Sequence, residues 1–546
     1  MDQQKSNDDN ESDSANSPMV EKSMVKDADS PKKATFDDVL QQIGQFGPYQ
    51  RRIYFLLFLP TIFCAMHKLA WVFLGAQVNH RCKLPSEPSN VSYDAIETNE
   101  TCFYYLNGQK SECDHGYVYD KTNFGSSAVM DWNMVCGEKA MRATAQAIFM
   151  LGVLIGSYLF GEMSDRIGRK PTFFLSVVLQ IIFGLLAGFA PEYYSFVIAR
   201  LIIGATTSGV FLVSYVLAME SVGPKYRVIA GTLCQYYYTF GLFVMAFIAY
   251  FLNHDWKLLQ IVLTAPSIVF LTYWWIVPES VRWLIRKGKY DQAKIQIEKI
   301  ANENKTELPE AMMDQMIEQC KLDDQDKKGT ISIFNIFTRK NLLKNSLIIF
   351  FLWFVNSGTY YGLSLGASNL GGNPYLNFMI SAAVEIPAYA INLMFLNNPK
   401  VGRRLGHSTF MLIAGLALTI TIFVPEDLTS LIIALSMIGK LAITTSYGVI
   451  YIYTAELFPT VIRNAGVGTS SLCARIGGII CPYINMLIDT WRPLPLIIYG
   501  IMAFIGGMLT LLLPETLNKE LPETIEDGEK FASQGNICCS PKQNET

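Results

Sequence analysis

The chain has 546 residues, of which 51% are apolar and 17% are charged, and its formal net charge is −3. Soluble domains carry about a quarter of charged residues, so this composition indicates a membrane protein. The small net charge and the lack of a basic patch interleaved with aromatic residues argue against a nucleic-acid partner. Scattered histidines, cysteines without metal-ligand spacing and the lack of a phosphate-binding Gly-rich loop predict neither a metal site nor a cofactor.

An N-terminal tail precedes the first apolar run. Residues 1–36 are rich in Asp, Asn, Ser, Lys and Glu and contain almost no aromatic residues. Such a segment buries too little apolar surface to offset the entropy lost on ordering. We therefore expect residues 1–50 to form a disordered cytosolic tail. Because the pattern of a cleaved signal peptide is missing, the first span itself should target the chain to the membrane.

Twelve apolar runs are long enough to cross a bilayer as helices, which takes about 20 residues each. Six fall in residues 51–278 and six in residues 343–513, which predicts an all-α membrane protein of two six-helix halves. The expected spans of the first half are 53–76, 143–162, 171–190, 195–217, 229–252 and 258–278. Those of the second half are 343–366, 376–396, 407–424, 429–453, 464–488 and 493–513.

The distribution of Lys and Arg among the short loops predicts the orientation, because cytosolic loops are enriched in these residues. One set of loops carries Arg51 and Arg52, and further along the chain Arg227 and Arg463. In the other set, residues 190–195 and 367–375 contain neither Lys nor Arg. We therefore expect both termini to lie in the cytosol.

This orientation places the long polar stretch 77–142 outside the cell. Four cysteines in an oxidising compartment predict two disulfides, and the spacing leaves all three pairings open. Two sequons, at Asn90 and Asn99, are expected to carry glycans. A third, at Asn304, falls on the cytosolic side and should remain unmodified. The four cysteines are Cys82, Cys102, Cys113 and Cys136.

Two more charged segments are expected in the cytosol. Residues 279–342 join the halves and contain helix-compatible stretches at 290–303 and 310–320, which predicts a linker with short surface helices. Residues 514–546 form the C-terminal tail.

An internal repeat relates the two halves. Glu220 precedes Arg227 by seven residues, and Glu456 precedes Arg463 by the same interval. Equivalent positions lie 236 residues apart, as do the Glu residues of Pro278-Glu279-Ser and Pro514-Glu515-Thr. A parallel repeat of six spans is typical of transporters whose halves rock about a central site. The repeated charges are therefore expected to pair within one half and to stabilise one conformation, rather than to act as weak solvated pairs.

The segment Gly161-Glu-Met-Ser-Asp165-Arg-Ile-Gly-Arg169-Lys170 resembles the signature loop of the major facilitator superfamily. This resemblance implies that Asp165, Arg169 and Lys170 gate the cytosolic side. The counterpart, Lys400-Val-Gly-Arg403-Arg404, lacks the Asp, which leaves an equivalent lock in the second half undecided.

Three further features are similar to the organic cation, carnitine and organic anion transporter family. They are the segment Pro278-Glu-Ser-Val-Arg-Trp-Leu284, the segment Tyr453-Thr-Ala-Glu-Leu-Phe-Pro-Thr-Val-Ile-Arg-Asn464 and the large cysteine-bearing loop. Tyr360-Tyr-Gly-Leu-Ser-Leu, Val384-Glu-Ile-Pro387 and Gly439-Lys-Leu-Ala-Ile resemble the invertebrate organic cation and carnitine branches. The resemblance runs from about residue 37 to about residue 528.

This resemblance implies a plasma-membrane secondary transporter, not an enzyme, that carries small organic cations or zwitterions by alternating access. It leaves undecided whether a sodium ion or a proton is coupled. The alternatives are an organic anion exchanger on the same scaffold and a membrane protein that binds a ligand without transporting it.

Ionisable residues inside spans are costly and are by default functional candidates. Glu385 matches a family carboxylate that faces the substrate, where it would attract an ammonium group; its alternative is a structural ion pair. Aromatic rings add cation–π attraction for quaternary ammonium groups. The remaining candidates that resemble the family's cavity are Phe211, Gln235, Tyr238, Trp353, Tyr360, Tyr361 and Tyr447.

Arg475 occupies a position where the cation branch tends to carry an Asp. A buried guanidinium binds carboxylates well, and with Lys440 it would repel a purely cationic substrate unless it is paired internally. Together with Glu385, these residues predict a site with poles of both signs, suited to a zwitterion such as carnitine. We expect Lys68 to snorkel toward the external interface and leave the role of His67 open.

Overall fold

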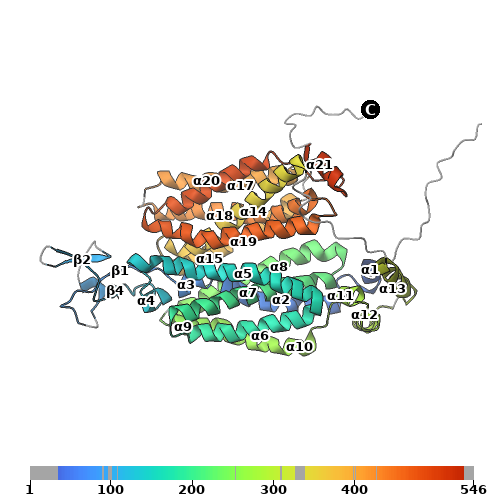
Figure 1. The fold of residues 1–546 in the computed structure, drawn as a ribbon, viewed down its shortest axis with the longest axis horizontal. Helices are drawn as coiled ribbons and strands as arrows, with labels where there is room; N and C mark the ends of the chain where they lie inside the picture. The colour runs from blue at the N-terminus through green and yellow to red at the C-terminus, as the bar shows by residue number, and fades with distance from the viewer. Residues whose placement is uncertain are drawn as a thin grey trace, which may run out of the picture.

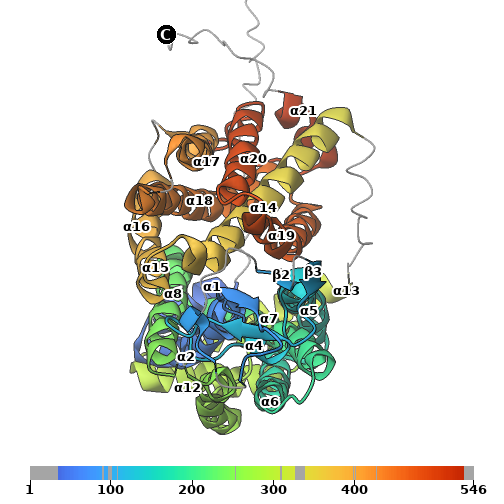
Figure 2. The same ribbon diagram turned by 90° about the vertical axis from the view of Figure 1, so that its left-hand side faces the viewer.

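The computed structural model of the chain describes residues 35–533 except 89–90, 96–100, 107–108, 253, 308–309, 326–338, 397–398, 400 and 426. Two helical bundles lie one above the other, the N-terminal half in blue to green and the C-terminal half in yellow to red (Figure 1). Figure 2 shows where they meet, with α15 beside α8 and α5 beside α19.

The membrane-crossing helices of the N-terminal half follow the six predicted spans. The helices are α2 (Pro48–Leu69), α3 (Trp71–Leu74), α5 (Lys139–Ile167), α6 (Arg169–Gly188), α7 (Tyr193–Ser221), α8 (Arg227–Phe251), α9 (Trp256–Thr264) and α10 (Tyr273–Ile276). Those of the C-terminal half are α14 (Lys340–Gly366), α15 (Pro374–Ala383), α16 (Glu385–Leu396), α17 (Gly402–Ile420), α18 (Thr429–Leu457), α19 (Arg463–Met486) and α20 (Leu494–Thr510). In the described chain, eleven segments are long and apolar enough to span a membrane, and α20 is a shorter apolar helix. The prediction of twelve spans is confirmed.

Span 8 is not one continuous helix but is interrupted in the middle of the bundle. The break falls at Val384, between α15 and α16 and three residues before Pro387. Proline has no backbone N–H to donate to the preceding turn, and its ring crowds the carbonyl four residues earlier. The break places Glu385 at the first residue of α16, inside the protein rather than at a membrane surface.

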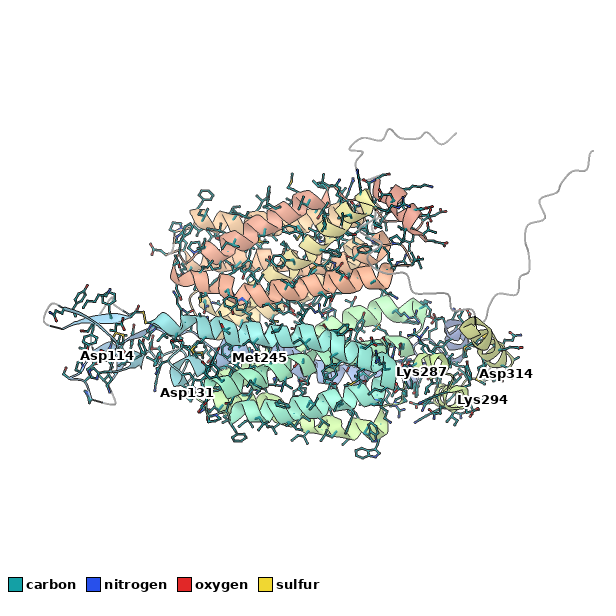
Figure 3. The ribbon with its side chains drawn as sticks, viewed as in Figure 1. Asp114, Asp131, Met245, Lys287, Lys294 and Asp314 are labelled. Carbon is teal, nitrogen blue, oxygen red and sulfur yellow. A yellow bond between two sulfur atoms is a disulfide. The ribbon has the colours of Figure 1, made fainter. Side chains whose placement is uncertain are left out.

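Charged side chains gather at the two ends of the bundles, as expected for a protein that crosses a bilayer. Figure 3 shows Asp114 and Asp131 at one end, Lys287, Lys294 and Asp314 at the other, and Met245 between them. We call the end that carries residues 77–142 the loop face. The opposite end, which carries α11 (Val281–Arg286), α12 (Tyr290–Asn304) and α13 (Glu310–Gln325), is the linker face.

The loop face carries a small domain of two separate two-stranded antiparallel sheets, which the sequence pattern did not indicate. β1 (His80–Cys82) pairs antiparallel with β4 (Tyr117–Tyr119), and β2 (Phe103–Leu106) pairs antiparallel with β3 (Gln109–Glu112). The short helix α4 (Ala128–Asp131) follows. The four cysteines form two disulfides, Cys82–Cys113 and Cys102–Cys136. Asn90 and Asn99 lie outside the described residues.

A buried ion pair stabilises this domain. The guanidinium of Arg81 reaches both carboxylate oxygens of Glu87, each at 2.9 Å. This hydrogen bonding holds the pKa of Glu87 below its ordinary value. The pair therefore contributes stability above the ordinary carboxyl pKa of about 4.3, and this contribution is lost as the pH falls through the lower folded-state pKa.

Replacing Glu87 by Gln should flatten the acid side of the stability profile. We expect the melting temperature of the purified wild type to fall more steeply below about pH 4 than that of Glu87→Gln, with the variant less stable at pH 7. Melting curves in detergent between pH 7 and pH 3 measure the difference. Equal slopes for the two proteins would show that the pair does not stabilise the domain.

The linker face is more ordered than we predicted. The helices expected at 290–303 and 310–320 are present as α12 and α13, but α1 (Phe36–Ile43) precedes the first span. The prediction of a disordered tail up to residue 50 is therefore wrong for residues 36–50. The apolar residues of α1 recur at helical spacing and pack against α12 and α13. Burial of their apolar surface offsets the conformational entropy lost on ordering. These residues are Phe36, Val39, Leu40 and Ile43.

One asparagine and one glutamate attach the flanking helices to the bundles. The amide of Asn304 donates to the Ile43 carbonyl and the Gln50 side chain, and its oxygen accepts from the Tyr49 backbone N–H. This sequon asparagine therefore has a structural role. In the C-terminal tail, α21 (Ile525–Ser533) places Glu529 at the start of α14, where it accepts from the Leu342 backbone N–H. The C-terminal tail therefore contains a helix, on whose presence the sequence made no prediction.

Candidate functional site

Glu385 lies at the centre of the interface between the halves and is fully enclosed. Its side chain is 0% exposed and forms an ion pair of 3.0 Å with Lys440 on α18. Hydroxyl groups supply the other hydrogen bonds, from Thr239 on α8 at 2.9 Å and from Tyr360 on α14 at 2.8 Å. Lys440 also donates to Ser381 on α15 at 2.7 Å. Glu385 thus joins both halves, and Lys440 neutralises its charge.

Tyrosine rings from α14 and α18 form a cluster beside this pair. The ring of Tyr360 packs against Tyr361 at 5.3 Å and against Tyr447 at 6.2 Å, measured between ring centroids. Trp353 lies behind Tyr447, fully buried, and donates to the Thr454 hydroxyl at 2.9 Å. The half-buried Tyr361 and Tyr447 are therefore presented to the interface, whereas Trp353 supports them.

Arg475 lies on α19 among these rings. Its guanidinium donates to the side chain of Ser471 at 2.7 Å and to the Ser471 carbonyl at 3.2 Å, and its Nε has no partner. In the described part of the chain no carboxylate pairs with Arg475. The guanidinium therefore retains donors that can bind a carboxylate ligand.

Lys68 faces the same interface from the N-terminal half. Its ammonium lies 4.8 Å from the ring centroid of Phe211 and 5.5 Å from that of Tyr238. Each such contact contributes about 0.5–2 kcal/mol, depending on desolvation. The prediction that Lys68 snorkels toward the external interface is wrong, because its helix presents it to the aromatic residues of α7 and α8.

Two other predicted residues have simpler surroundings. Gln235 lies half-buried on α8, one helical turn before Thr239. His67 is buried beside Arg200, whose guanidinium donates to the Gln146 side chain and stacks on the ring of Trp71. We assign His67 to this buried cluster rather than to the interface.

Several residues of the interface were missed by sequence reasoning. Thr239, Tyr389 and Ser381 contact the Glu385–Lys440 pair, and Tyr451 contacts the rings around Arg475. Tyr451 could have been found, because it follows Tyr447 by one helical turn and shares its face. Uncharged hydroxyl residues in a span carry no comparable signal.

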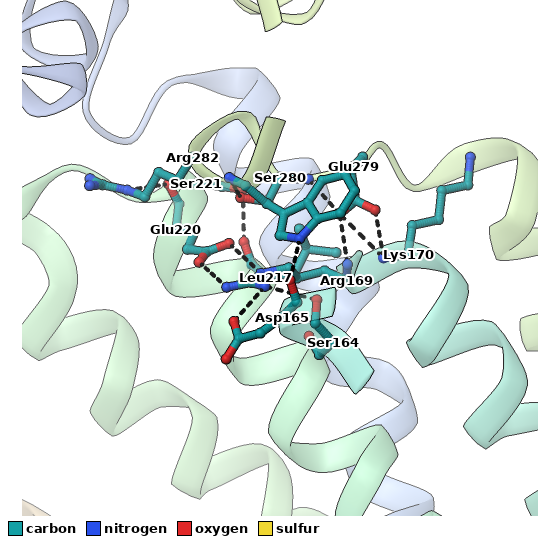
Figure 4. Close-up of polar contacts among 11 residues, drawn as sticks. Ser164, Asp165, Arg169, Lys170, Leu217, Glu220, Ser221, Glu279, Ser280 and Arg282 are labelled. Carbon is teal, nitrogen blue, oxygen red and sulfur yellow. Dashed lines mark hydrogen bonds and ion pairs between the residues drawn. The ribbon is translucent and has the colours of Figure 1, made fainter. Parts of the chain in front are cut away.

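A charge network at the linker face joins helix ends of the N-terminal half. Arg169, at the start of α6, donates to Asp165 at 2.8 Å and to Glu220 at 3.0 Å (Figure 4). Glu279 accepts from the backbone N–H groups of Arg169 and Lys170, at 3.0 and 3.2 Å. Burial raises the pKa of Glu279. The network ties together α5, α6, α7 and the segment after α10.

The C-terminal half contains the same network without the Asp. Arg403, at the start of α17, pairs with Glu456 at 3.2 Å. Glu515 accepts from the backbone N–H groups of Arg403 and Arg404, at 2.7 and 3.0 Å. Thr516 adds a hydrogen bond to Glu456 at 2.6 Å. The second half therefore contains an equivalent charge network, although its motif lacks the Asp.

The repeated arginines after each Glu have other partners. Arg227 pairs with Asp37 of α1 at 2.6 Å, and Arg463 donates to the Phe458 carbonyl at 3.3 Å. Glu220 and Glu456 therefore pair with the arginines of the neighbouring helices rather than with those seven residues later.

Gly168 and Gly402 lie directly before the first arginine of each network, and substituting them tests whether the two networks share one geometry. Both have positive φ, +117° and +66°, and an added Cβ would meet the carboxylates of Glu279 and Glu515 respectively. A left-handed backbone costs a residue with a Cβ roughly 1–2 kcal/mol before any steric conflict. We expect Gly168→Ala and Gly402→Ala each to lower the melting temperature of the purified protein by several degrees.

Gly468 is the matched control, because a Cβ there meets nothing within 4 Å and the residue lies in α19. Gly468→Ala should leave the melting temperature unchanged or raise it. A loss of stability in Gly468→Ala equal to that of the other two variants would contradict a specific role of the two networks.

Contacts between the halves lie at the loop face and in the middle of the described bundle. At the loop face, Asp489 accepts from Gln77 at 2.8 Å and pairs with Lys139 at 3.8 Å, and Thr144 contacts Tyr483 at 3.1 Å. These residues lie beneath the loop domain, where a cavity of about 1230 Å³ is lined by both halves. Both charge networks at the linker face, by contrast, lie within one half.

Comparison with known proteins identifies the relatives of this chain. The family model described as "Sugar (and other) transporter" matches residues 97–527. The "Organic cation transporter protein" of Drosophila melanogaster is 52% identical over 528 residues, covering 91% of this chain and 95% of that protein. The human "Organic cation/carnitine transporter 2" is 33% identical over 527 residues, covering 90% and 93%. The xylose transporter XylE from E. coli, in a partially occluded inward open conformation, superposes with a TM-score of 0.61 at 17% identity, over 87% of this chain and 100% of XylE.

The twelve-helix fold and its repeated networks define a transporter of the major facilitator superfamily, which is not an enzyme. Within it, the chain belongs to the organic cation, carnitine and organic anion transporter family. It is therefore a multi-pass membrane transporter of organic cations or anions.

Proposed function

We propose that the protein carries small zwitterions of the quaternary-ammonium carboxylate class, such as carnitine, across the plasma membrane by alternating access. The loop face is then extracellular, and both termini lie in the cytosol, as the distribution of Lys and Arg indicates. The observation that carries the proposal is the guanidinium of Arg475, which lies among tyrosine rings without a carboxylate partner in the described chain.

The two ends of such a substrate match two kinds of group at the interface. A guanidinium binds a carboxylate through charge-assisted hydrogen bonds, and the Nε of Arg475 has no partner in the described chain. Tyr361, Tyr447 and Phe211 offer ring faces that attract a trimethylammonium group. Glu385 adds negative potential nearby, weakened by its pair with Lys440.

Alternating access is supported by the arrangement of the contacts. The parallel repeat gives each half its own rigid network, Arg169–Glu220 and Arg403–Glu456. Because the halves touch at the loop face and in the middle, opening toward the linker face leaves both networks intact. Rigid halves that rock about a central site account for this pattern.

The competing proposal is an organic anion exchanger, and one observation favours it. Lys440 neutralises Glu385, so Lys68 and Arg475 give the interface an excess of positive charge. A protein that binds a ligand at the loop face without transport is less well supported, because both halves retain their networks.

Uptake into cells that express the protein tests these proposals. Radiolabelled carnitine, tetraethylammonium and para-aminohippurate are compared, with and without sodium. Carnitine uptake that exceeds the other two supports the zwitterion carrier, and its sodium dependence identifies the coupling ion. Uptake of para-aminohippurate alone would support the anion exchanger, and surface binding without accumulation would support the non-transporting protein.

A further inference from the structure

One of the two disulfides of the loop domain lies beside a histidine and is open to a cavity. Cys102, which is exposed, and Cys136, which is half-buried, both line the cavity of about 1230 Å³ beneath the domain. Nε2 of His80, on β1, lies 3.5 Å from Sγ of Cys136. Among the described residues no histidine contacts the other disulfide, Cys82–Cys113, and Cys82 is buried. The two disulfides therefore differ in access and in chemical surroundings.

His80 is arranged to accept a proton at the sulfur of Cys136. Its Nδ1 lies 3.4 Å from the carbonyl of Val78, which can only accept, so the neutral ring carries its proton on Nδ1. Nε2 then directs its lone pair toward Cys136. The rings of Tyr117 and Tyr119 pack against the imidazole, with centroids at 5.7 and 6.2 Å. Burial lowers the pKa of His80, so the ring is neutral at pH 7.

The backbone at Cys136 also favours the opening of this disulfide. Its φ is +52°, a left-handed conformation that is unfavourable for a residue with a Cβ. Cys136 begins the short helix η2 (Cys136–Glu138), which runs directly into α5, and α5 packs against α19 of the other half. The disulfide thus ties the loop domain to a helix at the interface. Breaking the S–S bond removes a covalent constraint on a strained residue.

We propose that the disulfide Cys102–Cys136 is a modification site, at which a small thiol opens the bond by exchange and His80 takes up the proton. The sulfur of the incoming thiol forms a new S–S bond with the exposed Cys102, and the bond between Cys102 and Cys136 breaks. Cys136 leaves as a thiolate, and the proton of the thiol passes to Nε2 of His80. One S–S bond replaces another, so the thiol is the only co-reactant.

The position of His80 determines which sulfur leaves. A thiolate beside a protonated histidine is stabilised, and a more stable thiolate is the better leaving group. Cys136 is therefore the leaving sulfur, and the exposed Cys102 keeps the mixed disulfide. The cavity is large enough to admit a small thiol such as glutathione.

Glutathione and the purified wild type in detergent test the proposal without any substitution. Free thiols are trapped with iodoacetamide at intervals, and peptide mass spectrometry measures the opening of each disulfide. Cys102–Cys136 should open at least about tenfold faster than Cys82–Cys113, and the first glutathione adduct should be on Cys102. Equal rates for the two disulfides, or a first adduct on Cys136, would overturn the proposal.

Two histidine variants test the role of the imidazole. His80→Phe retains a ring to pack against the tyrosines but has no proton acceptor, and it should slow the opening of Cys102–Cys136 about tenfold. The opening of Cys82–Cys113 in the same molecule should be unchanged. His115→Phe, at an exposed histidine of the same domain, is the matched control and should leave both rates unchanged.

The outcomes are independent of the proposed function, because none of them requires transport. The same rate of Cys102–Cys136 opening in the wild type and in His80→Phe would show that His80 takes no part. Melting curves establish that the variants are folded. If His80→Phe does not fold, His80→Gln replaces it, because an amide fills part of the same space and does not take up a proton.

Discussion

The single variant Glu385→Gln is expected to destabilise the protein by about 3–5 kcal/mol, because it leaves Lys440 buried without its counter-charge. Both side chains are nearly inaccessible, at 0% and 2% exposure, so water cannot compensate the remaining charge. Lys440→Met should have an effect of the same size, because it leaves the charge of Glu385 buried without its counter-charge. The melting temperature of the purified protein and its amount at the cell surface measure both effects.

The double variant Glu385→Gln/Lys440→Met distinguishes a structural pair from a substrate site. Replacing both members removes both buried charges, so most of the lost stability should return. Recovery of folding together with carnitine uptake would make the pair structural, whereas recovery of folding without uptake would give Glu385 a role in binding. Single variants that fold as well as the wild type would contradict the buried pair itself.

Arg475→Ala is expected to weaken the uptake of carboxylate-bearing substrates strongly while leaving the protein folded. A charge-assisted hydrogen bond contributes about 1.5–3 kcal/mol, which predicts a KM that is about 10- to 150-fold higher for carnitine. Since Arg475 has no carboxylate partner in the described chain, its removal leaves no buried carboxylate without a counter-charge. Concentration-dependent uptake, normalised to surface protein, gives the KM.

Arg475→Lys is the informative control for this variant. It retains the charge but loses the planar fork, so carnitine uptake should recover only in part. Full activity of Arg475→Ala with carnitine would place the carboxylate elsewhere. A collapse of expression in both variants would instead show that Arg475 is structural.

The fold could be predicted from the sequence because the bilayer imposes a length and a polarity on every span. The repeat spacing likewise predicted charge networks in both halves. The partners could not be predicted: Glu220 pairs with Arg169, which is 51 residues away, rather than with Arg227 nearby. Such pairings depend on how helices pack, which the sequence pattern does not contain.

Which side chains meet in the site could not be predicted either, because this also depends on how the helices pack. Glu385 and Arg475 were recognised as ionisable residues within spans, but the pairing of Glu385 with Lys440 depends on how α16 packs against α18. The inward direction of Lys68 depends on the rotation of α2 about its axis. The strands of the loop domain contain only three or four residues each, too few to give a period.

Counterflow in proteoliposomes tests most directly whether the protein is a carrier with a zwitterion site. Purified protein is reconstituted into liposomes that contain millimolar unlabelled carnitine, and a trace of labelled carnitine is added outside. The account predicts transient accumulation of label above equilibrium, which disappears in Arg475→Ala. Label that binds to the liposomes but never accumulates, or accumulation that Arg475→Ala leaves unchanged, would contradict it.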